Sequence, residues 1–254
     1  MKKTIDSWSF SRLNIFEACQ YRAKLQFLDR VPDNTPRPAA DRGTAIHAQG
    51  EQYVKGDHEL PASLSKFSTD FAVLRSQYRK GRVLLEQEWG FNRDWTPVDW
   101  RTAWVRIKCD AVVCLTDKHI VTIDYKTGQR FGNEVKHLDQ LHLYAVAVLL
   151  RYSNIEKVTV ENWYIDRDEK VDYVLHRHQL GKFLANFDTR GRKMTETTEF
   201  KPNPNQFTCR NCPYGPDKQG DCQYGVSSKV TFKKTVPQPI ELVNTPSPTD
   251  NLFT

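Results

Sequence analysis

Two acidic residues and a lysine in the middle of the sequence have the types and the spacing of a metal-dependent hydrolytic site. Asp110 lies in one β-rich segment, and Asp124 and Lys126 lie in the next one, after a short polar turn. Because side chains alternate across a strand, Asp124 and Lys126 point to the same side, and Asp110 joins them if the apolar faces of both segments agree. Carboxylates gathered in this way suit a hard divalent cation and a water molecule that the cation polarises.

An Asp-x-Lys pair on a strand is also typical of a solvated face or a weak surface ion pair, and taken alone it favours that interpretation. Two flanking segments change the balance. In the helix expected at 133–151, Gln140 and Tyr144 are four residues apart and therefore lie on one face. Upstream, His47 lies in a helix that Gly43-Thr44 opens. Polar groups on both neighbouring helices thus favour a chemical site over a solvated surface.

The elements that must position these residues follow from apolar periodicity and turn signals. Helices are expected at 9–28, 44–54, 66–80, 133–151 and 178–199, and strands at 83–91, 103–116, 119–128, 156–166 and 171–176. The order around the candidate site is helix, three strands, helix, strand. In the segment at 103–116, one wholly apolar face is expected to hold Val105, Ile107, Cys109, Ala111, Val113 and Leu115. The chain is therefore expected to be an α/β protein with a mixed sheet flanked by helices.

Taken together, these motifs resemble the RecB-like branch of the PD-(D/E)XK nuclease superfamily, which includes the AddB-type and CRISPR-associated exonucleases. The matching pieces are Gly43-Thr44-x-x-His47, Asp110, Ile123-Asp124-Tyr125-Lys126-Thr127-Gly128 and Gln140-x-x-x-Tyr144. The resemblance implies a restriction-endonuclease-like αβββαβ core. It also implies one nuclease domain over 1–225, with a helical N-terminal part at 9–82 and a cysteine-bearing C-terminal loop at 200–225. Residues 226–254 are rich in Pro, Ser and Thr and are expected to form a flexible tail.

The resemblance also implies a role for each residue of the site. Asp110 and Asp124, with the backbone carbonyl of Tyr125, would hold one or two Mg²⁺ or Mn²⁺ ions, and His47 would complete the coordination. Lys126 would orient the attacking water and neutralise developing charge.

Gln140 and Tyr144 would position the substrate strand or that water. For His47, a hydrogen-bonded helix histidine is the alternative interpretation. Glu86 and Glu88 share a face of the first strand, and Glu88 is kept as a further candidate ligand.

Four of the six cysteines have a separate significance. Cys109 is expected to be a small buried apolar residue, and Cys114 lies roughly 13 Å along the strand from Asp110, too far to share its metal. By resemblance to the same nucleases, a [4Fe–4S] cluster would be held by Cys19, Cys209, Cys212 and Cys222. The long interval before Cys222 departs from the family pattern, as does Gln20 in place of proline after Cys19. A four-thiolate Zn²⁺ site and free thiols are the alternatives.

Composition bounds the partners. A net charge of +6 and a pI of about 8.9 suit an acidic polymer such as DNA. Arg75, Arg79 and Arg82 follow one another at i, i+4 and i+7, which indicates either a solvated face or a phosphate-binding stripe. No apolar run approaches the length of a membrane span, and the N-terminal segment lacks the apolar core of a signal peptide. A cytoplasmic protein with reduced thiols is therefore expected.

The expected function is a metal-dependent DNA exonuclease that acts on single-stranded DNA or duplex ends in recombination, repair or replication. A helicase motor would have to be a separate protein, because the sequence contains no GxxxxGK[ST] motif. The expected partners besides DNA are a helicase, a recombinase or a replication protein. Two alternatives stay open. One is a non-catalytic DNA-end-binding module with a structural four-cysteine metal site. The other is a structure-specific endonuclease with the same chemistry.

Overall fold

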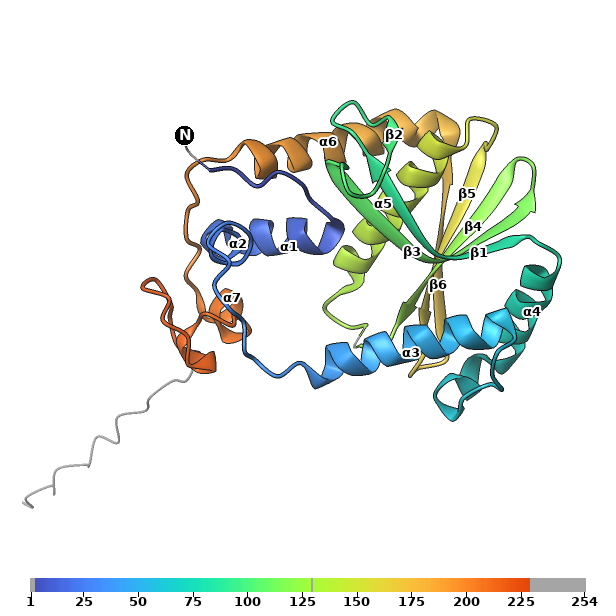
Figure 1. The fold of residues 1–254 in the computed structure, drawn as a ribbon, viewed down its shortest axis with the longest axis horizontal. Helices are drawn as coiled ribbons and strands as arrows, with labels where there is room; N and C mark the ends of the chain where they lie inside the picture. Colours follow the sequence, from blue (N-terminus) through green and yellow to red (C-terminus); the bar gives the residue numbers. More distant parts are fainter. Residues whose placement is uncertain (1–2, 129, 229–254) are drawn as a thin grey trace, which may run out of the picture.

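The computed structural model describes residues 3–128 and 130–228, and a six-stranded sheet forms its centre (Figure 1). The strand order is β2-β1-β3-β4-β5-β6. The strands are β1 (Val83–Phe91), β2 (Pro97–Val98), β3 (Val105–Thr116), β4 (His119–Lys126), β5 (Lys157–Tyr164) and β6 (Glu169–His176). Only β4 and β5 pair in parallel, and every other neighbouring pair is antiparallel. A parallel pair needs a crossover connection, and the helix between β4 and β5 provides it.

Helices cover both faces of this sheet. The α-helices are α1 (Phe10–Ala18), α2 (Gln20–Phe27), α3 (Pro38–Lys55), α4 (Ser68–Arg79), α5 (Glu134–Arg151), α6 (Leu180–Glu196) and α7 (Gln206–Arg210). Short 3₁₀ helices are η1 (Ala62–Phe67), η2 (Arg177–Gln179) and η3 (Pro216–Lys218). One apolar core joins the sheet to α1, α5 and α6, and a second joins it to α3, η1 and α4. The expected α/β architecture, a mixed sheet flanked by helices, is confirmed.

Strands β1 and β3 change face halfway along their length. In β3, Val105, Ile107 and Cys109 belong to the core under α5, whereas Ala111 and Val113 belong to the core under α3 and α4. The prediction of one continuous apolar face is therefore wrong, and Leu115 at the end of that face is exposed.

The change of face occurs where Asp110 and Glu86 lie opposite each other. Their neighbours pair in the ladder as Leu85 with Ala111 and Gln87 with Cys109. Glu86 has a φ of 50°, in the left-handed region that residues other than glycine rarely adopt. Strained backbone of this kind persists only where the surroundings hold it, and it is frequent at functional sites. Asp110 is placed by this irregularity rather than by simple alternation.

The expected first helix is interrupted at one residue, Cys19. Its extended backbone (φ −160°, ψ 110°) separates α1 from α2. The break turns the cysteine toward the C-terminal segment, where the backbone N–H of Asn203 lies 3.5 Å from its Sγ. The backbone N–H of Tyr21 also donates to the carbonyl of Lys201. The N-terminal arm, α1 and α2, is thereby joined to the segment that carries the other three cysteines.

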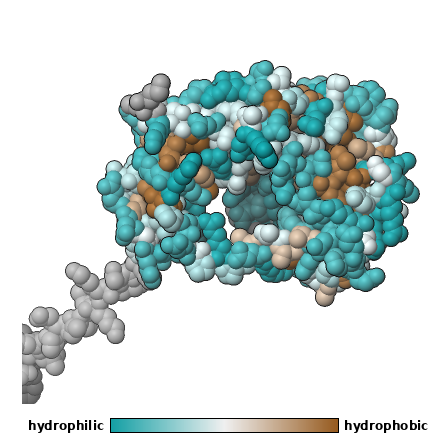
Figure 2. Space-filling model, viewed as in Figure 1, coloured by the Kyte–Doolittle hydropathy of each residue, from teal (hydrophilic) through white to brown (hydrophobic). Residues whose placement is uncertain are grey.

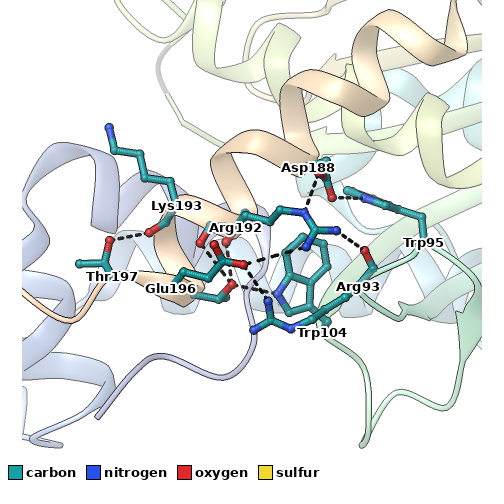
Figure 3. Close-up of polar contacts among 10 residues, drawn as sticks. Arg93, Trp95, Trp104, Asp188, Arg192, Lys193, Glu196 and Thr197 are labelled. Carbon is teal, nitrogen blue, oxygen red and sulfur yellow. Dashed lines mark hydrogen bonds and ion pairs between the residues drawn. The ribbon is translucent and has the colours of Figure 1, made fainter. Parts of the chain in front are cut away.

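A cluster of three tryptophans fastens the last long helix to the sheet. The rings of Trp8, Trp95 and Trp104 meet edge to face, with centroids 5.6 to 6.1 Å apart. The indole N–H of Trp95 donates to Asp188 of α6 (Figure 3), at a distance of 3.0 Å. The indole N–H of Trp104 similarly donates to the hydroxyl of Thr195 at 3.0 Å. Each buried indole N–H of these two residues therefore has a partner on α6, which fixes the helix against the strands.

The second expected helix is longer than predicted. Helix α3 begins at Pro38 rather than near Thr44, because proline suits the first helical position, where its missing N–H costs nothing. The expected tail at 226–254 lies outside the described residues from 229 onward, and the hydroxyl groups of Ser227 and Ser228 donate to Asp217. Among the described residues, none of the helices combines the length and the apolar character that crossing a membrane requires.

Candidate active site and cysteine site

Four side chains from β4 and α5 form a closed ring of polar contacts. Lys126 Nζ donates to Gln140 Oε1 at 2.7 Å, and Gln140 Nε2 donates to the Tyr144 hydroxyl at 2.7 Å. That hydroxyl donates to Asp124 Oδ1 at 3.0 Å. Asp124 Oδ2 lies 2.6 Å from Lys126 Nζ and closes the ring as an ion pair. Every member therefore fixes the orientation of the next.

The ring follows from two local periodicities. Asp124 and Lys126 are one strand repeat apart on β4, and Gln140 and Tyr144 are one helical turn apart on α5. Helix α5 packs over β4 as the crossover element, so the two pairs must meet. Burial, followed by the charge of Asp124, raises the pKa of Tyr144 well above its usual value, so its hydroxyl stays a hydrogen-bond donor. The structure thus brings together all four residues that the sequence placed here.

Asp110 and His47 form a second group on the α3 side of the sheet. His47 Nδ1 lies 3.1 Å from Asp110 Oδ1, and His47 Nε2 lies 2.9 Å from the carbonyl oxygen of Tyr125. The backbone N–H of Tyr125 donates to Asp110 Oδ2 at 2.7 Å. Helix α3 can approach β4 closely because it carries Gly43, where a Cβ atom would lie 3.2 Å from the Thr127 hydroxyl.

The electrostatics of this group favour a bound cation. Burial raises the pKa of Asp110, and the nearby charge of Asp124 adds to the effect. Burial opposes protonation of His47, but the hydrogen bond that its ring donates to Asp110 and the charges of both carboxylates raise its pKa overall. The carboxylates of Asp110 and Asp124 are both buried and lie close enough to repel each other. A divalent cation would balance their negative charge.

Glu86 is the third potential metal ligand. Single donor atoms of His47, Glu86 and Asp110 all lie within 4.8 Å of one another. Glu86 also pairs with Lys108 at 2.7 Å. Glu88, the further candidate ligand from the sequence, is exposed. Strand parity could not distinguish the two glutamates, because the left-handed backbone at Glu86 breaks the alternation.

Asp124 contributes to the same region from the ring. Its carboxylate contacts Tyr144 and Lys126, and its charge acts on both His47 and Asp110. The predicted metal-binding residues therefore form two groups of contacts that lie close enough to interact electrostatically. His47 and Asp110 are together, Asp124 belongs to the ring, and the carbonyl of Tyr125 lies between them.

The row of Arg75, Arg79 and Arg82 lies away from these groups. Arg75 packs over the ring of Tyr53 with its guanidinium 4.8 Å from the centroid, and it donates to the carbonyl of Gly56. Arg79 and Arg82 are exposed at the turn from α4 to β1. None of the three lines the cleft beside Lys126, which lies between α1, β3 and the start of α5. Their role in phosphate binding stays a prediction.

The four distant cysteines come together around one small cavity. It is lined by Cys19, Cys209, Cys212 and Cys222, along with Arg22. Burial raises the pKa of the Cys212 thiol, and the neighbouring thiols of Cys222 and Cys19 add to this effect.

The remaining two cysteines lie elsewhere, as expected. Cys109 is buried under α5, and burial raises the pKa of its thiol well above the usual value. Cys114 is exposed near the end of β3.

The chain matches one family model and is similar to several solved structures. Residues 7–216 match the family model of the PD-(D/E)XK nuclease superfamily. The chain is similar to the solved structure of a putative exonuclease from Eubacterium rectale, at 14% identity and a TM-score of 0.46, with 82% of this chain and 86% of that chain covered. It is also similar to a phage-related exonuclease from Haemophilus somnus, at 9% identity, a TM-score of 0.32 and coverages of 75% and 93%. A third similar structure is an alkaline exonuclease from Laribacter hongkongensis, at 13% identity and a TM-score of 0.26, with 76% of this chain and 93% of that chain covered. No curated protein matches the sequence.

Proposed function

Because the chain belongs to the PD-(D/E)XK nuclease superfamily, we propose that it is a metal-dependent DNA exonuclease of the RecB-like, AddB-type branch, working on single strands or duplex ends in recombination, repair or replication. The observation that supports this proposal most directly is the closed ring of Asp124, Lys126, Gln140 and Tyr144 beside the carboxylate of Asp110. Such a ring fixes the ammonium group of Lys126 next to the carboxylate of Asp124. A fixed positive charge of this kind can stabilise the charge that develops when an anionic phosphodiester is attacked.

The donors present suit Mg²⁺ or Mn²⁺. Asp110 and Glu86 offer carboxylate oxygens and His47 a ring nitrogen, all within 4.8 Å of one another. Asp124 and the carbonyl of Tyr125 would complete the set from the adjoining strand. Such an ion, when bound, polarises the scissile phosphate and lowers the pKa of a water molecule. Hard oxygen donors dominate the set, which is typical of these ions.

Lys126 has a defined part in the reaction. Its ammonium group has three N–H donors, and two of them face Gln140 and Asp124. The third is available to the substrate, where it would orient the attacking water and stabilise the charge that develops on the phosphate oxygens. Groups that stabilise a transition state in this way are worth about 3 to 4 kcal/mol when removed singly.

Cleavage of end-labelled oligonucleotides with Mg²⁺ or Mn²⁺ tests the proposal. We expect Lys126→Ala and Asp124→Asn to lose at least about a hundredfold in rate while retaining the circular dichroism spectrum of the wild type. Lys80→Ala, at an exposed lysine after α4, is the matched control. Full activity in both site variants would contradict the proposal. Circular single strands separate exonuclease from endonuclease action, since an exonuclease leaves them intact.

For the four cysteines we propose a [4Fe–4S] cluster. The four thiols line one cavity, and four thiolates are the usual ligand set of such a cluster. A Zn²⁺ ion held by the same four thiolates is the alternative. Anaerobic purification followed by iron, zinc and sulfide analysis tests this, and zinc-loaded, iron-free protein would contradict it.

A further inference from the structure

A cleft lined with basic side chains leads to Lys126. It lies between α1, β3 and the first turns of α5 and has a volume of about 810 Å³. Figure 2 shows the molecule hollowed at this place, between the N-terminal arm and the core. Six cationic residues line it, and the lining contains no Asp or Glu: Arg12, Arg22, Arg106, Lys108, Lys126 and Lys136. Such one-signed charge around a concave surface attracts an anionic polymer.

Three of these cations are not held in close ion pairs. In the described part of the chain, no carboxylate lies within ion-pair distance of Arg12, Arg22 or Lys136, although the charge of Asp6 acts on Arg12. The Nε atoms of Arg12 and Arg22 are buried and have no hydrogen-bond partner among these residues. Burial and the neighbouring charges of Lys126 and Arg22 lower the pKa of Lys136, so these groups lie close enough to repel one another. Bound phosphates would relieve this repulsion and satisfy the unused N–H groups.

We propose, on the basis of the nuclease function proposed above, that Arg12, Arg22 and Lys136 bind successive phosphates of a polynucleotide strand whose scissile phosphate lies at Lys126, and that the cysteine site holds Arg22 in this track. The first part rests on the cleft and its unpaired cations. The second rests on the position of Arg22, which is shared between two cavities.

Arg22 lines both the basic cleft and the cysteine cavity. It lies on α2, three residues after Cys19, and its charge also acts on the thiol of Cys212. Because Cys19 ends one helix and begins the next, whatever fixes its sulfur also fixes the position of α2. A metal centre held by the four thiols would therefore set the position of one phosphate contact in the cleft. Lys136, on α5, is not placed by that centre.

The edge of the cleft also suits a single strand of nucleic acid. Trp100 is partly exposed there, and the guanidinium of Arg106 lies 5.8 Å from the centroid of its ring. Hydrogen bonds from Arg106 to the carbonyls of Trp100 and Arg101 hold the pair in place. An indole beside a fixed guanidinium is a surface on which an unstacked base can lie. The substrate class that fits this track is therefore a single strand.

Binding of a fluorescent single-stranded oligonucleotide tests the track without cleavage, in buffer freed of divalent cations on chelating resin. The slope of log K against log salt should fall by about 0.7 for each phosphate contact removed from a single strand. We expect this fall in Arg12→Ala, Arg22→Ala and Lys136→Ala, and no change in Arg79→Ala, the exposed control. Unchanged slopes in all three, with normal cleavage by the wild type, would overturn the track and leave the nuclease proposal standing. A wild type that neither binds nor cleaves would overturn the nuclease proposal itself.

The role of the cysteine site is tested by a double-mutant cycle on the same binding slope. Cys212→Ser should reduce the slope as Arg22→Ala does, and the two changes combined should reduce it no further than either alone. With Lys136→Ala the effect of Cys212→Ser should be additive. If Cys212→Ser does not fold, the comparison uses wild type, Arg22→Ala and Lys136→Ala before and after removal of the cysteine-bound metal. A loss of slope on metal removal that is as large in Arg22→Ala as in wild type would overturn the coupling.

Discussion

The hydroxyl of Tyr144 donates to Oδ1 of Asp124 at 3.0 Å, and both side chains are buried. The same hydroxyl accepts from Gln140, which in turn accepts from Lys126. Tyr144→Phe removes two of the four contacts of the ring at once. We expect kcat to fall about tenfold to a hundredfold, since the lost hydrogen bond to the charged Asp124 is worth about 1.5 to 3 kcal/mol.

Steady-state cleavage rates check this prediction, and Gln140→Ala provides a second variant for it. Because the ring is already open in either single variant, the double variant should be little slower than the worse of the two. Multiplying effects would show that Gln140 and Tyr144 act independently, contrary to the geometry.

Asp110→Asn is expected to separate stability from activity. Asp110 is buried, and burial followed by the charge of Asp124 raises its pKa, so the charged carboxylate is held at a cost to the fold. An asparagine can still accept the N–H of Tyr125 through its side-chain oxygen. We therefore expect a free energy of unfolding equal to or above that of the wild type, together with loss of metal-dependent cleavage. Urea titration measures the first and an oligonucleotide assay the second. A markedly less stable variant would show that Asp110 is mainly structural.

How much of this site can be predicted from the sequence depends on how far apart along the chain the interacting residues lie. The ring of Lys126 and Tyr144 was predictable because it needs only a strand repeat, a helical turn and one crossover helix. The position of Glu86 was not, because a left-handed residue in the middle of β1 changes which side chains face α3. The basic cleft was missed for a similar reason. Arg12 and Lys136 lie more than a hundred residues apart in the sequence, and only the packing of α1 against the core brings them together.

The cysteine site offers a matched pair of variants. Cys19 lines the cavity shared by the four distant cysteines, whereas Cys114 is exposed near the end of β3. We expect Cys19→Ser to lose most of the bound iron and Cys114→Ser to keep it, as measured by elemental analysis of anaerobically purified protein. Because Cys19 also separates α1 from α2, its variant should show faster proteolysis of the N-terminal arm. Equal iron contents in the two variants would exclude Cys19 as a ligand.

His137 should make the protein less stable in mild acid. Its Nδ1 lies 2.8 Å from the Tyr164 hydroxyl, and burial, with the charge of Lys126, lowers its pKa from 6.5 to about 4. Above pH 6.5 the ring is neutral in both the folded and unfolded states. As pH falls from 6.5 toward 4, the unfolded chain takes up a proton that the folded chain does not, so the free energy of unfolding decreases.

Urea titrations between pH 7.5 and pH 4 measure this decrease. His137→Gln should flatten the dependence over that range, whereas His58→Gln, at an exposed histidine after α3, should leave it unchanged. An identical pH dependence in wild type and His137→Gln would remove this histidine from the explanation.

Two glycines of α6 should respond to alanine in opposite directions. A Cβ atom at Gly191 would lie 2.5 Å from Nε1 of Trp8 and 2.9 Å from the Trp104 ring, so the buried tryptophan cluster would have to move. Overpacking of this kind costs about 1 to 3 kcal/mol. At Gly181, near the start of the same helix, a Cβ would meet nothing within 4 Å. There alanine should stabilise the protein by about 0.5 to 1 kcal/mol, because glycine loses more backbone freedom on folding. Thermal or urea unfolding of the two variants measures both effects, and a stable Gly191→Ala protein would mean that α6 is not seated against Trp8 in the way described.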